Sequence, residues 1–340
     1  MMVPQEKYMR RALELASKGL GHVSPNPLVG CVIVHEDKIV GEGYHHQYGG
    51  AHAEVAAISS LLDAKVLAQS DLYVTLEPCA HHGLTPPCAD LLVKHQVKRV
   101  IIAQKDPNPL VNGGGIDKLA AAGIEVISGF LSEDAKVLNR RFNTYFGQQR
   151  PYVILKWAQT DDGFIARENY DSKWISGPRS RQLVHSWRAQ EDAILVGKNT
   201  VLYDDPKLTV RDWSGSHPIR IVIDHKQVLP MDKSIFDNEV TTYRYHQTGT
   251  LINENEIKLT SGDFLRDLLT DLHAKRIQSL IVEGGAATLQ SFIDADLWDE
   301  ARVFTAAHSF EKGISAPTHK GKLMTMREVG RDRLNIYEKA

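Results

Sequence analysis

The sequence of 340 residues contains only three cysteines, Cys31, Cys79 and Cys88. Three thiols are too few for the disulfide framework that stabilises small secreted proteins. The sequence also has no apolar run that suits a membrane span or a signal peptide. It therefore predicts a cytoplasmic protein with free thiols and no membrane partner.

An excess of charge of one sign is also missing. Lys and Arg together number 40 and Asp and Glu 42, so that the formal net charge is −2. Without surplus cations the chain has little with which to follow a phosphate backbone, and nucleic acid is a disfavoured partner. Hydrophobic residues make up 42% and charged residues 24%, as is usual for a soluble globular protein.

The arrangement of apolar residues predicts two α/β domains. At 340 residues the chain exceeds the size at which one hydrophobic core usually stops growing. β-Branched runs alternate with amphipathic stretches, and the alternation restarts after a polar connection at Asn139 to Pro151. We expect one domain at residues 1–147 and another at 148–340. Residues 241–259 match no pattern, and we expect a variable surface region there.

These patterns also give approximate positions for the elements. We expect strands at 28–34, 72–75, 99–103, 152–157, 193–196, 219–223 and 280–282. We expect helices at 6–18, 53–62, 88–95, 179–188, 262–275 and 287–295.

The most informative residues of the first domain are His52-Ala53-Glu54, Pro78-Cys79 and Cys88. One His and two Cys are three zinc ligands, and a catalytic zinc site has three protein ligands and an open fourth position. In zinc deaminases with the pattern H-x-E then P-C-x-x-C, the Glu is not a ligand and moves protons to the leaving amine. Bound water in such a site ionises near neutral pH. The pattern therefore predicts hydrolytic chemistry.

A closed structural zinc site is the alternative interpretation. Its fourth ligand would have to be one of His45, His46, His81 and His82. It leaves Glu54 without a role, because a structural site needs no carboxylate beside its ligands. We therefore favour a catalytic site.

The interval between the cysteines departs from the deaminase pattern, because eight residues separate Cys79 from Cys88 instead of two. This interval and the near-neutral charge oppose a deaminase of nucleic-acid bases. Positions i and i+2 do not share a helix face, so that His52 and Glu54 converge on one metal only if His52 lies at the helix start. Cys88 also begins a predicted helix, and positive helix N-termini favour thiolates.

In the second domain the strongest local pattern is Val282-Glu283-Gly284-Gly285-Ala286, which leads into a predicted helix. A strand, a glycine turn and a helix N-terminus together form a natural phosphate site, because glycine permits close approach to free amides. Alone the pattern is weak, since Gly-Gly after a strand is often only a turn. The similar run Asn112 to Gly115 is interpreted as a turn.

Ordered groups of residues in both halves share one known pattern. In the first half these are Pro25-Asn26-Pro27, Val29-Gly30, Gly43, His45, His52 to Glu54, Leu76 to Cys79, His81, Gly83, Thr85 to Cys88 and Asp106 to Pro109. In the second half they are Lys156, Ala158, Asp162-Gly163, Trp174-Ile175, His185, Arg188, Asp192-Ala193, Gly197, Thr200, Asp204 to Pro206, Leu208-Thr209, Arg211 and Val282 to Gly285. By these residues the whole chain closely resembles the bifunctional riboflavin-biosynthesis deaminase/reductases, a family to which the long interval between the cysteines belongs.

The resemblance implies a cytidine-deaminase-like three-layer domain followed by a dihydrofolate-reductase-like domain. It implies a small-molecule substrate, a pyrimidine ribosyl phosphate. The first domain would use Zn²⁺ to remove the 2-amino group of a diaminopyrimidinone ribosylamino 5′-phosphate. The second would use NADPH to reduce the ribosyl group to ribityl, and copies of the chain would form a homo-oligomer through this domain. By resemblance, zinc is held by His52, Cys79 and Cys88, protons are moved by Glu54, and the substrate is oriented by Asn26 and His45.

The resemblance also assigns residues of the reductase domain. The substrate set is Ser172, Arg188, Leu208, Arg211 and Glu283. The cofactor set is Ala158, Trp174, Thr200, Asp204, Gly285, Ala286, Ala287, Thr288, Leu289, Gln290 and Ser291. The two arginines suit the substrate phosphate, because guanidinium presents a planar fork to its oxygens.

Two of these assignments have structural alternatives. Lys156 and Glu283 would provide the proton that accompanies hydride transfer, and the alternative is a buried ion pair that supports the strand ends. Trp174 would contact the cofactor, and the alternative is core packing, which is the usual environment of a large aromatic residue.

Two positions depart from the family. Leu84 and Gly114 stand where relatives commonly carry a basic residue. If those residues contact the substrate in relatives, this chain lacks two charge-assisted hydrogen bonds of about 1.5 to 3 kcal/mol each. The alternative function is therefore a reductase with an impaired or re-specialised zinc deaminase domain. Lys105, His81 and His82 are candidates to supply the missing charge.

Overall fold

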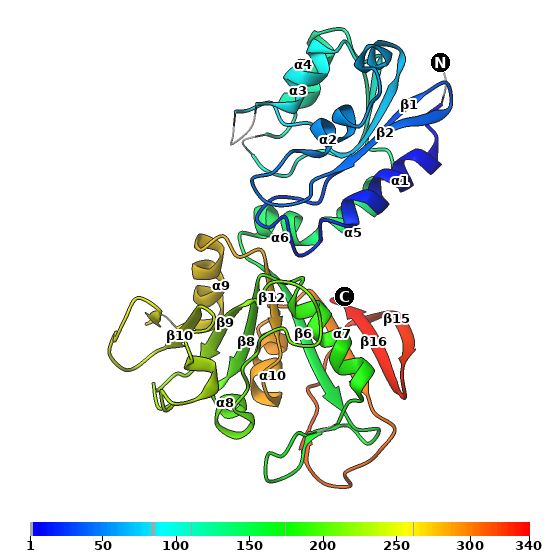
Figure 1. Ribbon diagram of the computed structural model, residues 1–340. Helices are drawn as coiled ribbons and strands as arrows, with labels where there is room; N and C mark the ends of the chain where they lie inside the picture. The colour runs from blue at the N-terminus through cyan, green and yellow to red at the C-terminus, as the bar shows by residue number, and fades with distance from the viewer. Residues whose placement is uncertain (1–2, 83–85, 110, 174, 261) are drawn as a thin grey trace. The chain divides into compact units, whose positions relative to one another are not determined.

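The structure, a computed structural model, describes residues 3–82, 86–109, 111–173, 175–260 and 262–340. The chain divides into two compact units, Met1–Gln148 and Gln149–Ala340 (Figure 1). The sequence places this division one residue earlier. Both units combine helices with sheets, which confirms the predicted α/β class. Among the described helices, none is long and apolar enough to cross a membrane.

The first unit is built on one sheet. Its elements are α1 (Glu6–Ser17), β1 (Gly30–His35), β2 (Lys38–Tyr44), α2 (Ala53–Ser59), the 3-10 helix Ala64–Gln69, β3 (Asp71–Leu76), α3 (Cys88–Lys94), β4 (Arg99–Gln104), α4 (Gly114–Ala121), β5 (Glu125–Ser128), α5 (Ser132–Leu138) and α6 (Arg140–Gln148). In the described residues the strand order is β2-β1-β3-β4-β5. β1 runs antiparallel to β2 and β3, and β3, β4 and β5 are parallel.

The sheet of the first unit is buried on both faces, and the alternation of its side chains explains why. Cys31 and Ile33 of β1 pack in the core beneath α2, α3 and α4, whereas Val32 and Val34 pack in the core beneath α1 and α5. Successive residues of a strand point to opposite faces, so a continuous apolar run serves both layers. The result is the predicted three-layer arrangement.

The prediction of a polar connection at 139–151 is wrong in one respect, because α6 occupies most of it. Phe142 is buried, and its ring lies 4.7 Å from that of Phe146, four residues later. Residues at this spacing meet on one helix face, and the polar residues around them hide the periodicity. The helix ends before Gln149, which has a positive φ of 53°, and Pro151 cannot continue it.

The second unit is built on a larger sheet. Its elements are β6 (Tyr152–Gln159), β7 (Phe164–Ala166), α7 (Pro178–Arg188), β8 (Ala193–Gly197), α8 (Lys198–Asp204), β9 (Ile219–Ile223), the 3-10 helix Ser234–Phe236, β10 (Thr242–His246), β11 (Glu256–Lys258), α9 (Phe264–Ala274), β12 (Ser279–Val282), α10 (Ala286–Asp294), β13 (Glu300–Thr305), β14 (Ile314–Ser315), β15 (Lys322–Val329) and β16 (Asp332–Glu338). In the described residues the strand order is β11-β10-β9-β8-β12-β6-β13-β16-β15.

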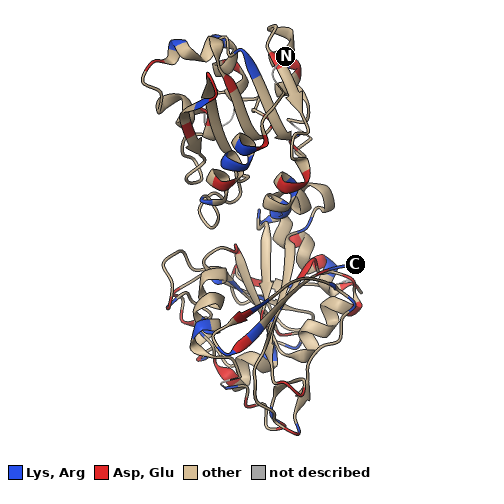
Figure 2. Ribbon diagram, turned by 90° about the vertical axis from the view of Figure 1, so that its right-hand side faces the viewer, with Lys and Arg blue, Asp and Glu red and all other residues tan. Residues whose placement is uncertain are grey.

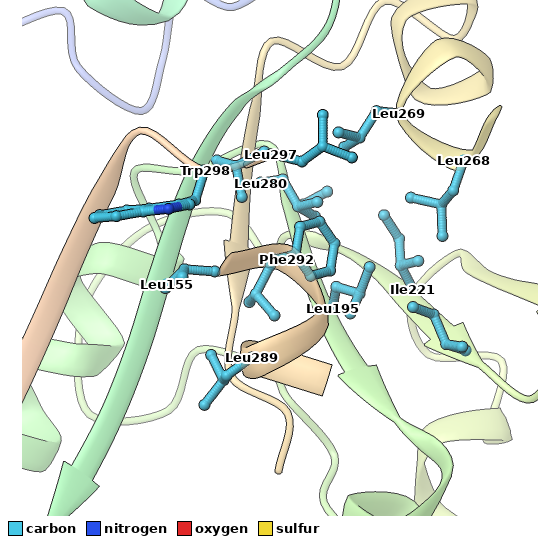
Figure 3. Close-up of a cluster of buried hydrophobic side chains, with 14 of the residues drawn as sticks. Leu155, Leu195, Ile221, Leu268, Leu269, Leu280, Leu289, Phe292, Leu297 and Trp298 are labelled. Carbon is cyan, nitrogen blue, oxygen red and sulfur yellow. The ribbon is translucent and has the colours of Figure 1, made fainter. Parts of the chain in front are cut away.

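The strands from β11 to β13 in this order are parallel, and β16 and β15 continue the sheet antiparallel. α9 and α10 cover one face, where Leu268 and Phe292 pack on Leu155 and Leu280 (Figure 3). Val184 of α7 belongs to the core on the other face. The carboxyl ends of β8, β9 and β12 therefore lie at one edge, next to the starts of α8 and α10.

The expectation of a variable surface region at 241–259 is wrong in part, since the continuous exposed segment is limited to residues 247–254. β10 and β11 lie within 241–259, and Arg244, Tyr245 and His246 are buried. The buried charge is balanced, because Asp224 accepts hydrogen bonds of 3.2 and 2.6 Å from the guanidinium of Arg244. A charged residue inside a strand hides the apolar pattern by which a buried strand is predicted.

Lys, Arg, Asp and Glu all occur along the ribbons of both units (Figure 2). This agrees with the near-balance of 40 basic and 42 acidic residues.

Candidate functional site

The three predicted zinc ligands of the first unit lie together. His52 is the residue before α2, Cys79 follows β3, and Cys88 is the first residue of α3. Nδ1 of His52 lies 3.6 Å from Sγ of Cys79 and 3.3 Å from Sγ of Cys88. Among the described residues these three form a group whose ligand atoms lie within 4.8 Å of one another, with no fourth His, Cys, Asp or Glu in it.

The group fits a zinc ion. Tetrahedral bonds of about 2.3 Å to sulfur and about 2.0 Å to nitrogen require the donor atoms to be roughly 3.5 Å apart. The two N–S distances, 3.6 and 3.3 Å, meet this requirement. Three ligands leave one position open, which is the arrangement of a catalytic site.

Sγ of Cys79 and Sγ of Cys88 share a hydrogen bond, which shifts the pKa values of the two thiols in opposite directions. The contact with Cys88 lowers the pKa of Cys79 to about 4, and the same contact raises the pKa of Cys88. The backbone N–H of Cys88 also donates to Sγ of Cys79 at 3.3 Å. The pair therefore holds one thiolate and one proton, and metal binding would release that proton.

Glu54 lies in the first turn of α2, and its side chain is buried beside this group. Burial, followed by the charge of Cys79, raises the pKa of Glu54 to about 6. A carboxyl group with such a pKa can both accept and release a proton near neutral pH.

The two residues predicted to orient the deaminase substrate lie next to the ligands. Nδ1 of His45 bonds to the carbonyl of Ala51 at 2.9 Å, and Nε2 lies 3.0 Å from Nδ2 of Asn26. A carbonyl can only accept, so Nδ1 carries the proton and Nε2 accepts from Asn26. Burial lowers the pKa of His45, which favours this neutral form. The ring of His45 lies 5.7 Å from that of His52.

Of the two positions at which this chain departs from the resembled family, the structure describes one, Gly114. Gly114 is the first residue of α4, and a Cβ there would lie 3.5 Å from that of Ala80, which is ordinary contact. Leu84 lies outside the described residues.

In the second unit a cluster of three charges lies at the strand ends. The guanidinium of Arg188 donates to Glu283 at 3.0 and 2.9 Å, and Nζ of Lys156 lies 3.4 Å from the same carboxylate. Burial alone would raise the pKa of Glu283, but the charges of Arg188 and Lys156 outweigh it and lower that pKa to about 2. Glu283 is therefore ionised at neutral pH.

Most of the predicted cofactor residues surround a pocket of about 800 Å³ at the carboxyl ends of β8 and β9 and the start of α10. The amide of Gly285 donates to Oγ1 of Thr200 at 3.0 Å, which connects α10 to α8. From both predicted sets, the residues that line the pocket are Ser172, Thr200, Asp204, Gly285, Ala286, Ala287, Thr288 and Ser291.

Other members of the two predicted sets lie elsewhere. Leu289 is packed in the core, and the side-chain amide of Gln290 bonds to Asp294 at 2.8 Å. Ala158 packs against the core on the α7 face. Leu208 is buried and Arg211 is exposed, and neither lines the pocket. Trp174 lies outside the described residues.

Ser172 and Asp204 form one wall of the pocket together. The hydroxyl of Ser172 lies 3.0 and 3.1 Å from the two carboxylate oxygens of Asp204. Burial raises the pKa of Asp204. The pair joins a residue predicted to bind substrate to one predicted to bind cofactor.

Several residues of the pocket were not predicted from the sequence. Lys198 begins α8, and His225 and Lys226 follow β9. The ring of His225 lies 4.3 Å from that of Phe264, which also lines the pocket. Their position after a predicted strand could have indicated them, because ligands of α/β sheets bind at the carboxyl ends of the strands.

Family comparisons divide the chain in the same order. Residues 2–104 match the cytidine and deoxycytidylate deaminase zinc-binding region, and residues 151–309 match the RibD C-terminal domain. The riboflavin biosynthesis protein RibD of Aquifex aeolicus is 42% identical over 318 residues, which cover 91% of this chain and 89% of that protein. RibD of Escherichia coli is 38% identical over 365 residues, which cover 96% of this chain and 97% of that protein.

Solved structures agree with this division. The crystal structure of a diaminohydroxyphosphoribosylaminopyrimidine deaminase/5-amino-6-(5-phosphoribosylamino)uracil reductase from Thermotoga maritima has a TM-score of 0.90 and 37% identity, with 98% of each chain covered. RibD from Acinetobacter baumannii has the same TM-score, 0.90, at 34% identity. Because both halves of these proteins are matched in order over nearly their full length, the chain belongs to the RibD family of bifunctional riboflavin-biosynthesis enzymes.

Proposed function

We propose that the first unit removes the 2-amino group of a diaminopyrimidinone ribosylamino 5′-phosphate by hydrolysis. We further propose that the second unit reduces the ribosyl group of the resulting aminouracil to ribityl with NADPH. The observation that carries the proposal is the buried carboxyl of Glu54 beside a His52, Cys79 and Cys88 group with three ligands. The substrate itself is taken from the name of the Thermotoga maritima relative, whose whole chain is matched.

In the deaminase, His52, Cys79 and Cys88 would hold zinc, which supplies an activated water when bound. Glu54 takes a proton from the attacking water and delivers a proton to the leaving amino nitrogen, so that ammonia departs. The second proton of the water ends on the ring nitrogen, and a carbonyl remains. Its pKa of about 6 suits a group that must perform both transfers in one cycle. Asn26 and His45 orient the pyrimidine, since their hydrogen bond fixes both side chains next to the ligands.

In the reductase, bound NADPH would supply a hydride to C1′ of the ribosyl group in its open-chain or iminium form. The accompanying proton comes from Nζ of Lys156, because Glu283 is ionised. Glu283 holds Lys156 and Arg188 in place through its hydrogen bonds. Arg188 is committed to this carboxylate, so Arg211, which is exposed, is the better candidate for the substrate phosphate.

The proposed cofactor is NADPH rather than NADH. The first turn of α10, from Ala286, presents free amides to the pocket and suits the pyrophosphate. Lys198 and Lys226 also line the pocket and are exposed, and in the described part of the chain neither forms an ion pair. These two cations are our candidates for the additional 2′-phosphate of NADPH.

We also propose that copies of the chain assemble through the second unit. β15 is an edge strand, and it exposes Leu323, Met324 and Met326 (Figure 1). An exposed apolar edge strand favours pairing with another chain. A mass measured by light scattering should fall to that of a monomer in Met326→Lys if this edge forms the interface, and an unchanged oligomer would exclude it.

To test the two-step function, zinc-loaded protein is incubated with the diaminopyrimidinone ribosylamino phosphate. Ammonia release and NADPH oxidation are recorded as separate traces. We expect both traces to rise, with ammonia first. NADPH oxidation that requires the pre-deaminated uracil would instead identify a reductase whose zinc domain no longer acts on this substrate.

The cofactor assignment has its own test. Lys226→Ala should raise the KM for NADPH by about 10-fold or more while the KM for NADH changes little, because only NADPH carries the 2′-phosphate. An equal effect on both cofactors would remove Lys226 from the 2′-phosphate site. Lys275→Ala, which removes the lysine directly after α9 that pairs with Asp271, is the control.

A further inference from the structure

Glu77 is a buried carboxylate that the proposed reaction does not use. It follows β3 directly and precedes Pro78 and the ligand Cys79. Its side chain accepts from four backbone N–H groups. Oε2 accepts from Asp106 at 3.3 Å and Gly113 at 3.1 Å, and Oε1 accepts from Gly115 at 3.0 Å and Ile116 at 3.3 Å.

These four donors belong to two segments far along the chain from Glu77. Asp106 follows β4, whereas Gly113, Gly115 and Ile116 surround the start of α4. In the described residues no Lys, Arg or His forms an ion pair with Glu77, so that its charge is balanced by peptide dipoles. The N-terminus of a helix is positive and stabilises such an anion.

The backbone N–H groups of the glycine run at the start of α4 therefore already donate to acceptors within the protein. The amide of Gly114, which Glu77 does not bind, donates to the carbonyl of Val111 at 2.8 Å. The turn predicted at Asn112 to Gly115 is present only in its first half, because Gly114 and Gly115 begin α4. The helix is also in close contact with the metal-binding segment, because a Cβ on Gly115 would lie 1.9 Å from the carbonyl oxygen of Pro78.

The same segment continues directly into the metal group. The carbonyl of Cys79 accepts from the amide of Ala89 at 3.1 Å, and its Sγ accepts from the amide of Cys88 at 3.3 Å. On one side Cys79 is thus fixed to α3, and on the other it is joined through Pro78 to Glu77. A shift of Glu77 would move a zinc ligand and the segment after β4 together.

We infer that Glu77 is a positioning residue of the deaminase, which fixes Cys79 for metal binding and holds Asp106 and residues 113–116 beside the site. The inference rests on the proposed deaminase function. Groups behind metal ligands orient those ligands, and their replacement typically costs 10- to 100-fold in metal affinity or activity. The alternative is that Glu77 only stabilises the fold as a distant cap of α4.

The test is Glu77→Gln in the full chain. Glutamine has the same length, but its amide nitrogen would face two backbone N–H donors. The zinc-loaded protein is challenged with a chromophoric chelator, and we expect about 10-fold weaker zinc retention or more. We also expect a raised KM for the pyrimidine phosphate, with unchanged NADPH oxidation on the pre-deaminated uracil. Wild-type zinc retention and KM in this variant would overturn the inference.

Asp71→Asn is the matched control, because Asp71 is a buried carboxylate at the opposite end of the same strand and pairs with Arg99. It should lower thermal stability and leave zinc retention unchanged. Equal losses of zinc in both variants would mean that Glu77 acts only through stability.

Glu77→Asp keeps the carboxylate on a side chain that is one methylene shorter, and it should lose less zinc than Glu77→Gln. If Glu77→Gln does not fold, zinc retention is compared between Glu77→Asp and the wild type instead. Wild-type protein that retains zinc but releases no ammonia would refute the proposed substrate, while the chelator comparison would still decide the role of Glu77.

Discussion

The carboxyl groups of Glu54, Glu77 and Glu283 lie in three different environments. Glu54 lies beside His52 and Cys79, and burial raises its pKa to about 6. Glu77 is surrounded by backbone amides. Glu283 lies against Arg188 and Lys156, which lower its pKa to about 2. The first of these environments produces a carboxyl group that exchanges protons near neutral pH, whereas the third keeps its carboxylate ionised.

Replacing Glu54 tests this distinction. Glu54→Gln should lower ammonia release by at least about 100-fold, because general acid–base catalysis contributes roughly that much or more. Zinc content should stay the same, since Glu54 does not belong to the ligand group. Both are measured on the purified variant, with NADPH oxidation on the pre-deaminated uracil as the control. Unchanged ammonia release would remove Glu54 from the mechanism.

The Glu283 cluster predicts a defined dependence of stability on pH. The folded-state pKa of about 2 lies below the ordinary value of 4.5, so its ionisation stabilises the folded state above about pH 4.5. This contribution is lost as the pH falls from 4.5 towards 2. At pH 7, Glu283→Gln should lower the free energy of unfolding by about 3 to 5 kcal/mol, because it leaves two buried cations unpaired.

The measurement is urea unfolding followed by tryptophan fluorescence at several pH values. All five tryptophans, the residues 157, 174, 187, 213 and 298, belong to the second unit. The difference between wild type and variant should shrink below pH 4.5. Glu168→Gln, at an exposed position, is the control. A difference that is independent of pH would show that the charge of Glu283 is not what stabilises the cluster.

At the scale of elements, the ends of helices and strands bring the site residues together. His52 precedes α2, Cys88 begins α3, and Cys79 follows β3. The sequence predicted these helix starts, because the apolar periodicity of each helix begins at those positions. It did not predict α6 or the strands β10 and β11, whose patterns are interrupted by polar residues such as Arg244.

The contact of α4 with the metal-binding segment gives a prediction for an element. Gly115→Ala should displace α4 from Pro78, since the added Cβ would lie 1.9 Å from a backbone oxygen that cannot move aside. Overpacking of this kind typically costs about 1 to 3 kcal/mol. We expect faster hydrogen exchange in residues 111–121 and reduced ammonia release.

Gly147→Ala is the control for this substitution. Gly147 lies in α6, and a Cβ there would meet no atom within 4 Å. Alanine in a helix interior is more stable than glycine by about 0.5 to 1 kcal/mol, so this variant should be neutral or stabilised. Equal exchange behaviour in the two variants would mean that α4 tolerates a side chain at Gly115.

At the scale of the whole molecule, the chain divides its two chemistries between two units. Each has its own sheet with cores on both faces. The metal group lies entirely in the first unit, and the pocket of about 800 Å³ lies entirely in the second. A unit with its own core is expected to fold as a unit.

Removal of zinc should therefore separate the two activities. After treatment with a chelator we expect ammonia release to be lost, while NADPH oxidation on the pre-deaminated uracil continues. Both are measured on the same sample, and added zinc should restore ammonia release. Loss of NADPH oxidation together with zinc would show that the second unit depends on the metal site.

The sequence by itself determined the α/β class and the family, which the structure and the comparisons confirm, and it predicted the types of the metal ligands. These properties depend on local periodicity and on short runs of residues such as His52 to Glu54. The tertiary structure decided which distant groups meet. Glu77 reaches amides near Gly115, Arg188 and Lys156 share Glu283, and Lys226 joins the pocket beside α10. These contacts depend on strand order, such as β8-β12-β6, and a local pattern predicts a strand without specifying its neighbours.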